Sequence, residues 1–226
     1  MPIRGVLLDV GGVLLIPDGA VVGSWLAAAG FEFEPAFDEA HFAGVTRVDE
    51  IRGDGDDTGR YLRGYVRRLG IRDDDRAVEA LLPLWERRSI ELWRTVLPGS
   101  VGGLRLLADH GLRLGIVSNS DGTVEEQLLA HGICQLGDGA GVNVLVIVDS
   151  AITGVAKPNP LIFASALEAL ALEPDEIAYV GDSVRYDVVA AVQAGFVAVH
   201  FDPHGLCSTH DHHHVSRVAD VLELPL

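Results

Sequence analysis

The chain has 226 residues, enough for one large domain or two modest ones, and 48% of them are apolar, which excludes a disordered chain. There are 33 acidic residues and 17 basic ones, so the formal net charge is −16. A field of that sign repels nucleic acid and anionic membranes, and we expect neither as a partner. An anionic substrate would need a local cluster of cations, most simply a metal ion.

No uninterrupted apolar stretch reaches the roughly 18 residues that a membrane-spanning helix needs, so the sequence predicts a soluble protein. The two cysteines, Cys134 and Cys207, have no CxxC spacing and are too few for a disulfide framework. We therefore expect reduced thiols and a cytoplasmic location. The sequence leaves the oligomeric state open between a monomer and a homodimer.

Five short apolar runs predict buried strands, at residues 6–10, 112–117, 144–148, 177–180 and 196–201. Several of them are apolar at consecutive positions, which is typical of a parallel sheet covered on both faces. Helical patterns precede or follow the later strands, at residues 101–110, 122–131, 160–172, 184–194 and 215–224. This alternation predicts an α/β fold with a Rossmann-like core of three layers and a mainly parallel, five-stranded sheet.

Residues 18–96, between the first two predicted strands, differ in composition from the rest of the chain. They contain all three tryptophans and most of the arginines, and their apolar periodicity is helical. We therefore predict an inserted all-helical domain that leaves the core at the turn 17–19 and returns near 98–99. The core domain then comprises residues 1–17 and 97–226.

Polar residues follow four of the predicted strands. They are Asp9 after the first strand, Ser118 and Asn119 after the second, Lys157 a few residues after the third, and Asp182 and Asp187 after the fourth. Ligands of open α/β sheets bind beyond the carboxyl ends of the strands, so we expect these residues to meet in one crevice. Three carboxylates at close range raise one another's pKa unless a cation neutralises them, and oxygen ligands favour Mg²⁺.

Four segments resemble, in order and spacing, the four signatures of the haloacid dehalogenase superfamily of aspartate-nucleophile hydrolases. They are LLDVGGVLL (7–15), IVSNS (116–120), GVAKPNPLIF (154–163) and YVGDSVRYD (179–187). The segment 97–119 is also similar to that family's return from its cap domain. The resemblance covers the whole core, and it implies that residues 18–96 form a helical cap over the active site.

The resemblance implies a Mg²⁺-dependent phosphatase that acts on a small phosphorylated metabolite. Asp9 would be the nucleophile and would form an aspartyl-phosphate. Ser118 and Lys157 would bind the transferring phosphoryl oxygens, together with backbone amides around Gly11 and Asn119. The groups that would hold the metal are the Asp9 carboxylate, the Gly11 carbonyl, Asp182 and, directly or through water, Asp187.

One position departs from the phosphatase pattern. A second Asp usually lies two residues after the nucleophile as general acid and base, and this sequence has Gly11 there. A positioned acid or base contributes typically ~10²–10⁴-fold, so we expect slow turnover, a good leaving group or a substitute group. Two alternatives stay open. The first is a metal-independent 2-haloacid dehalogenase-type hydrolase, although the Tyr and Arg usual there are not visible. The second is a catalytically weak protein that binds a phosphorylated ligand or a partner.

The histidine-rich segment 210–214 is the most biased stretch of the chain. It could bind Zn²⁺ or Ni²⁺, since His210 and His214 would share one face of a helix. Cysteine or carboxylate ligands at a set spacing are missing, so we favour a solvated loop. His200 and His204, beyond the fifth predicted strand and near the edge of the crevice, could each be a packing residue or a substitute base.

Closure of the predicted cap would exclude water from the active site and supply substrate contacts. Arg47 and Arg52 are candidates for specificity in this region. Trp25, Trp85 and Trp93 are expected to pack in the cap's own core, as large aromatic side chains commonly do.

Overall fold

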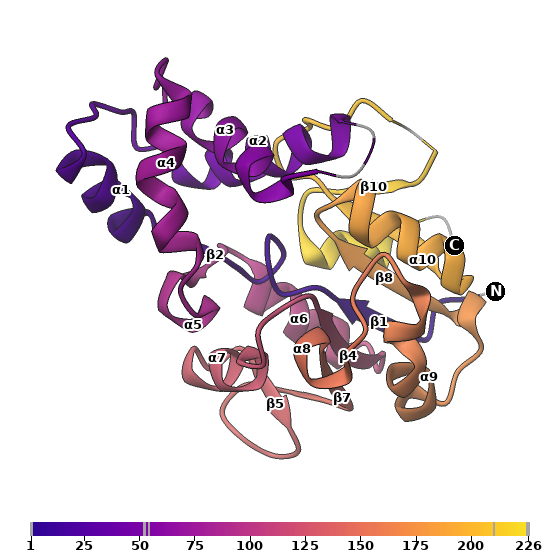
Figure 1. Ribbon diagram of the computed structural model, residues 1–226. Helices are drawn as coiled ribbons and strands as arrows, with labels where there is room; N and C mark the ends of the chain where they lie inside the picture. Colours follow the sequence, from indigo (N-terminus) through magenta and orange to yellow (C-terminus); the bar gives the residue numbers. More distant parts are fainter. Residues whose placement is uncertain (1, 52, 54, 210, 225–226) are drawn as a thin grey trace.

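The computed structural model describes residues 2–51, 53, 55–209 and 211–224 (Figure 1). Its centre is a six-stranded sheet in the order β10-β9-β8-β1-β4-β7, with every neighbouring pair parallel. The strands are β1 (Gly5–Leu8), β4 (Arg113–Ser118), β7 (Val146–Asp149), β8 (Ile177–Gly181), β9 (Val197–Phe201) and β10 (His213–Val215). The predicted α/β fold with a mainly parallel sheet is confirmed.

The sheet has one strand more than the five predicted. The additional strand, β10, pairs with the last three residues of β9 and contains only one apolar residue, Val215. No apolar run marks it in the sequence. The helix predicted over 215–224 is therefore wrong at its start, and its remainder is the 3-10 helix η4 (Val218–Glu223).

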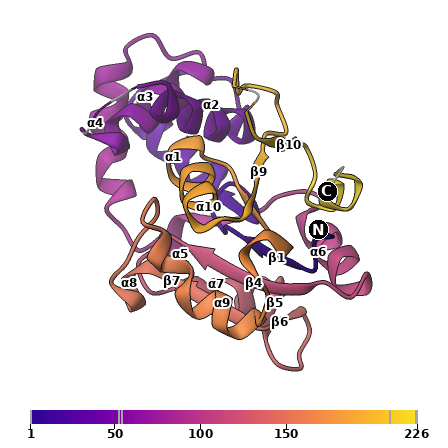
Figure 2. The ribbon, with the colours of Figure 1, turned by 90° about the vertical axis from the view of Figure 1, so that its right-hand side faces the viewer.

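Two apolar clusters cover the two faces of the sheet and create three layers. Val6 and Leu8 belong to one cluster and Leu7 to the other, because successive side chains of a strand point to opposite faces. Figure 2 shows α10 in front of the strands. The first face carries α6 (Ser100–Asp109), α7 (Val124–Ala130) and η4, and the second carries η1 (Pro160–Phe163), α9 (Ala164–Leu170) and α10 (Val189–Ala194).

Four of the helices between β1 and β4 gather at one end of the sheet, at the upper left of Figure 1, and a short fifth helix lies below them. We refer to them as the cap region. Leu26, Tyr65 and Leu81 are fully buried in an apolar cluster that belongs to this region alone. The helices are α1 (Gly19–Ala28), α2 (Phe37–Glu50), α3 (Asp57–Arg68), α4 (Asp74–Trp85) and α5 (Ser89–Leu92).

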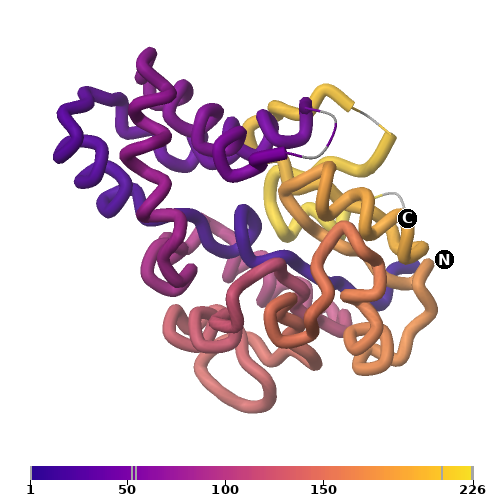
Figure 3. Tube along the Cα trace, viewed as in Figure 1, coloured from indigo at the N-terminus to yellow at the C-terminus, as the bar shows by residue number. Residues whose placement is uncertain are grey.

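The sequence analysis expected residues 18–96 to be entirely helical, and this expectation is wrong. Their last four residues form β3 (Trp93–Val96), which pairs antiparallel with β2 (Leu15–Pro17). The chain leaves the core along β2 and returns along β3 (Figure 3). Because β3 is half exposed and only four residues long, no apolar run reveals it in the sequence.

The remaining elements are short. The strand predicted at 144–148 is divided between β6 (Val142–Val144) and β7, and the glycine-rich stretch 137–141 connects β5 (Cys134–Leu136) to β6. Helices α8 (Ser150–Thr153) and η2 (Pro174–Glu176) lie in connections, and η3 (Val184–Val188) is a single π turn ahead of α10. None of the helices in the described part of the chain is both long and apolar enough to cross a bilayer.

Candidate active site

The carboxyl ends of two neighbouring strands, β1 and β8, bring the predicted carboxylates together. Asp9 follows β1, Asp182 follows β8, and Asp187 lies in η3. Each contributes one carboxylate oxygen that lies within 4.8 Å of the other two, and all three residues are buried. Ser118, the last residue of β4, is also buried and lines the same cavity.

Lys157 lies between two of these carboxylates and is the only lysine in the chain. Its Nζ is 2.8 Å from Asp9 Oδ2 and 2.7 Å from Asp187 Oδ1, and it donates to the Tyr179 hydroxyl at 2.7 Å. The Asn119 side chain accepts from the Lys157 backbone N–H at 2.8 Å and donates to its carbonyl at 3.0 Å. Asn119 therefore fixes the backbone that presents the ammonium group.

Burial raises the pKa of Asp9 from 3.8 to about 7, since the Lys157 ammonium offsets only part of the desolvation and the charges of Asp187 and Asp182 add to it. Burial likewise raises the pKa of Asp182 well above its ordinary value, with a further contribution from Asp187. Burial alone would lower the pKa of Lys157, but the carboxylates of Asp187 and Asp9 outweigh it and raise the pKa. Three buried carboxyl groups thus share one permanent positive charge, and a further cation would be favoured.

A histidine of the cap region reaches into this group, and no pattern in the sequence marks it. His41 Nε2 lies 2.9 Å from Asp182 Oδ2, and its Nδ1 lies 2.9 Å from the Tyr61 hydroxyl. Burial lowers the pKa of His41 to about 3, so the imidazole is neutral at pH 7. A neutral ring that donates from Nε2 and accepts at Nδ1 satisfies both contacts.

The cap region also holds the loop that carries Asp182. Asp49, in α2, accepts hydrogen bonds from the Ser183 hydroxyl at 2.8 Å and from the backbone N–H groups of Val184 at 2.8 Å and Arg185 at 2.9 Å. A carboxylate at the start of a helical turn satisfies N–H groups that have no partner within the turn. This contact joins α2 to η3 across 134 to 136 residues of sequence.

A cavity of about 400 Å³ separates the cap region from the strand ends. The core side contributes the charged and polar groups described above, and the cap side is mostly apolar and aromatic. Arg47 is not among the described residues that line the cavity, and its Nη1 lies 3.7 Å from Glu50 Oε2. Arg52 lies outside the described residues. The main apolar and aromatic groups of the cap side are Val45, Val48, Tyr61, Trp85 and Trp93.

The sequence analysis expected all three tryptophans to pack in the core of the cap region, but two of them have a further role. Trp25 does pack there, but Trp85 and Trp93 also face the cavity. A Cβ on Gly11 would lie 3.2 Å from the Trp93 ring, so the indole fills the space beside this position. Gly12 has φ +68°, and a Cβ there would overlap a carboxylate oxygen, so only glycine fits the turn after Asp9.

A family model of haloacid dehalogenase-like hydrolases matches residues 3–195 of this chain. The chain belongs to the haloacid dehalogenase-like hydrolases. The family resemblance of the four sequence segments is thereby confirmed, and with it the expectation of a hydrolase.

Two curated relatives of this hydrolase are named as phosphatases. It is 29% identical over 141 residues to the glyceraldehyde 3-phosphate phosphatase of Methanopyrus kandleri, covering 62% of this chain and 57% of that protein. It is 30% identical over 162 residues to the phosphoglycolate phosphatase of Neisseria meningitidis, covering 67% of this chain and 63% of the relative. The matched segments span between 35% and 63% of the length of the curated relatives.

The solved structures that share this fold include a dehalogenase with an intermediate complex. It aligns with a TM-score of 0.61 at 19% identity and covers 98% of this chain and 96% of that one. At this identity the likeness supports the fold alone, because one fold can carry several chemistries. The choice between phosphate and halide chemistry therefore depends on the residues around Asp9.

Proposed function

We propose that this hydrolase is a Mg²⁺-dependent phosphatase for a small phosphomonoester. The observation that carries the proposal is the charge of the site: three buried carboxyl groups surround one ammonium group, beside a cavity of about 400 Å³. A divalent cation would balance the two carboxylate charges that Lys157 leaves unpaired. Hard oxygen donors of this kind suit Mg²⁺, so the donor set fits the metal that the family implies.

The residues that would hold Mg²⁺ are Asp9, the Gly11 carbonyl and Asp182. When bound, the ion would supply positive charge against which a phosphate dianion can approach the anionic site. Both oxygens of Asp187 already accept hydrogen bonds, one from Lys157 at 2.7 Å and the other from the Ser183 backbone at 3.0 Å. We therefore assign Asp187 to holding Lys157 and to metal contact through water.

The proposed reaction has two steps. An Asp9 oxygen attacks phosphorus, an Asp9–phosphate bond forms, and the bond from phosphorus to the substrate oxygen breaks, leaving an alkoxide that takes a proton. Water then attacks the aspartyl-phosphate and releases inorganic phosphate. Lys157 and Ser118 would donate hydrogen bonds to phosphoryl oxygens whose charge is redistributed during both steps.

The cap side of the cavity supports a substrate whose organic part is uncharged. Apart from Lys157, no lysine or arginine is found among the lining residues that the structure describes, and Asp57 adds a carboxylate. Within this cavity, a second negative charge on the substrate would meet no described lysine or arginine other than Lys157 and would lose hydration. Glyceraldehyde 3-phosphate, named for one relative, has an uncharged body, whereas phosphoglycolate carries a carboxylate.

The test is a comparison of kcat/KM for phosphomonoesters of similar size, with glyceraldehyde 3-phosphate and phosphoglycolate as the central pair. We expect at least about 10-fold preference for the uncharged body, and loss of both activities in EDTA with recovery on adding Mg²⁺. Halide release from 2-chloropropionate in EDTA is measured in parallel. Metal-independent halide release, or binding of phosphomonoesters with no turnover, would contradict the proposal.

Gly11 has a direct experimental consequence. Gly11→Asp in a Trp93→Ala background is expected to raise kcat for an alkyl phosphate at least about 10-fold over Trp93→Ala alone, because a carboxyl group could then protonate the leaving oxygen. Gly11→Asp alone should gain less, since the Trp93 ring lies 3.2 Å from the new Cβ. The rates are compared with those for an aryl phosphate, whose leaving group needs no acid. An equal gain with Trp93 intact would show that the indole does not restrict this position.

A cytoplasmic location and a monomer or homodimer stay predictions from the sequence. Both cysteines are free thiols in the structure, as a reducing compartment would allow.

A further inference from the structure

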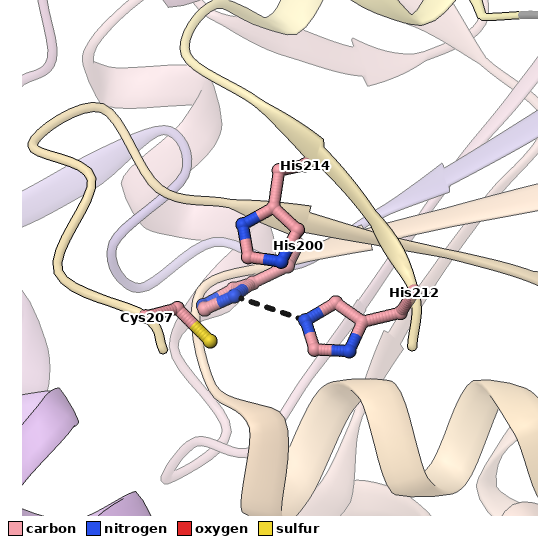
Figure 4. A group of neighbouring side chains, drawn as sticks. All are labelled: His200, Cys207, His212 and His214. Carbon is pink, nitrogen blue, oxygen red and sulfur yellow. Dashed lines mark hydrogen bonds between the residues drawn. The ribbon is translucent and has the colours of Figure 1, made fainter. Parts of the chain in front are cut away.

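A second group of potential metal ligands lies outside the cavity. His200 on β9, Cys207 in the loop that follows it, and His212 and His214 near β10 each bring one ligand atom within 4.8 Å of the others. Figure 4 shows the four side chains turned toward a common centre. The expectation of a solvated loop over 210–214 is wrong for His213 and His214, which lie in β10, while His210 lies outside the described residues.

Strand pairing explains why these residues meet. β10 lies parallel to β9 with His214 opposite His200, and His212 is two residues before His214, so both can project from the same side. The connecting loop is held by Asp202, whose carboxylate accepts from the backbone N–H of Cys207 at 3.0 Å. The cysteine ligand missing from the histidine-rich segment is therefore supplied by the preceding loop.

Hydrogen bonds determine which ring nitrogens carry protons. His200 Nε2 lies 2.8 Å from the backbone carbonyl of Asp182, which can only accept, so Nε2 is the N–H and Nδ1 has a lone pair. His212 Nδ1 lies 2.8 Å from the Asp211 carboxylate, which leaves a lone pair on Nε2. These two nitrogens face each other at 3.4 Å, along the dashed line of Figure 4. Neutral rings would oppose two lone pairs there, and a cation between them removes the conflict.

The distance of 3.4 Å between these two nitrogens matches a tetrahedral metal ion. Zn–N bonds of about 2.0–2.1 Å at tetrahedral angles place two ligand nitrogens about 3.3–3.4 Å apart. His214 donates from Nε2 to the Thr209 carbonyl at 2.9 Å, and its Nδ1 lies 3.7 Å from Asp202 Oδ2. The Thr209 hydroxyl, 3.2 Å from Cys207 Sγ, can donate to a thiolate. We propose that His200, Cys207, His212 and His214 form a Zn²⁺ site.

The surroundings support both the affinity and the accessibility of this site. Each imidazole donates its other N–H to a carbonyl or a carboxylate, which is the usual support of a metal-bound histidine. A cavity of about 120 Å³, lined in part by His200, Cys207 and Thr209, gives an entry path. Through His200, the metal would also fix the carbonyl of Asp182 at the edge of the active site.

The experiment uses untagged, metal-free protein titrated with Co²⁺ in an excess of Mg²⁺, which occupies the carboxylate site. We expect one equivalent to bind with intense tetrahedral d–d bands and a sulfur-to-cobalt charge-transfer band, and Zn²⁺ to displace the Co²⁺. Cys207→Ser should remove the charge-transfer band and weaken Zn²⁺ binding by more than the ~10–100-fold that the loss of an outer-shell partner costs. Cys134→Ala, which removes the other thiol, should keep the band.

Thermal unfolding supplies an independent readout. Zn²⁺ should raise the Tm of the wild-type protein in Mg²⁺ but not that of the variant Cys207→Ser with His212→Asn, because a ligand that binds only the folded state stabilises it. A weak octahedral cobalt spectrum without the sulfur band would overturn the proposal. Binding that disappears in Asp182→Asn but persists in the Cys207 and His212 variants would also overturn it.

Discussion

Replacement of Asp9 by asparagine is expected to lower kcat for phosphomonoesters by at least about 10³-fold, since an amide cannot form the phosphoenzyme. The substitution is nearly isosteric, and the amide oxygen can still accept from the Val10 backbone N–H, which lies 2.7 Å from Asp9 Oδ1. Mass spectrometry after acid quenching should find a phosphate on Asp9 in the wild-type protein only. Asp138→Asn, at an exposed carboxylate in the 137–141 connection, is the matched control and should keep wild-type rates.

The same variant should be more stable than the wild-type protein at neutral pH without metal. Because burial raises the pKa of Asp9 from 3.8 to about 7, the folded state binds more protons than the unfolded state within that interval. The free energy of unfolding of the wild-type protein therefore falls as pH rises from about 4 to about 7. Asparagine does not titrate, so the variant does not lose stability in this way.

Chemical denaturation in EDTA at about pH 4, 6 and 8 measures this difference. The gain in the free energy of unfolding of Asp9→Asn over the wild-type protein should be smallest at about pH 4 and largest at about pH 8. Mg²⁺ should reverse the order at the upper pH, since it binds the ionised carboxylate that only the wild-type protein has. An advantage that does not change with pH would mean that Asp9 is not held in the protonated form by burial.

Lys157→Met is expected to reduce both activity and stability. The side chain is 1% exposed and its Nζ lies within 2.8 Å of two carboxylates, so methionine would leave them buried with no cation. Loss of one partner of a buried ion pair typically costs about 3–5 kcal/mol. We expect a loss of that size at about pH 8 in EDTA, and a smaller loss at acid pH, where Asp9 is protonated.

Two further measurements separate this effect from a general packing defect. Arg4→Met breaks the Arg4–Glu176 ion pair of 2.7 Å, where the arginine is half exposed, and should change stability far less. Because Lys157 is the only lysine, incorporation of ¹³C-labelled lysine gives one lysine side-chain signal whose titration NMR can follow. A pKa below the ordinary value of 10.5 in the metal-free protein would contradict the ion-pair arrangement.

The sequence by itself determined the fold class and the expectation that the active-site carboxylates lie together. Strands covered on both faces must be apolar at consecutive positions, so runs such as 112–117 and 177–180 are legible without structure. The residues after parallel strands must meet at one sheet edge, which is why Asp9 and Asp182 could be brought together from topology alone. Chemistry placed at a strand end is therefore predictable wherever the strand itself is.

Only the tertiary structure decided the contacts that join separate elements. His41 reaches Asp182 across 141 residues, Trp93 fills the space beside Gly11, and neither side chain has a local pattern that distinguishes it from core packing. The short strand β10 has too few apolar residues to be recognised, yet it brings His214 opposite His200. Such pairings depend on the packing of whole helices and strands, and the periodicity of a single segment carries no information about them.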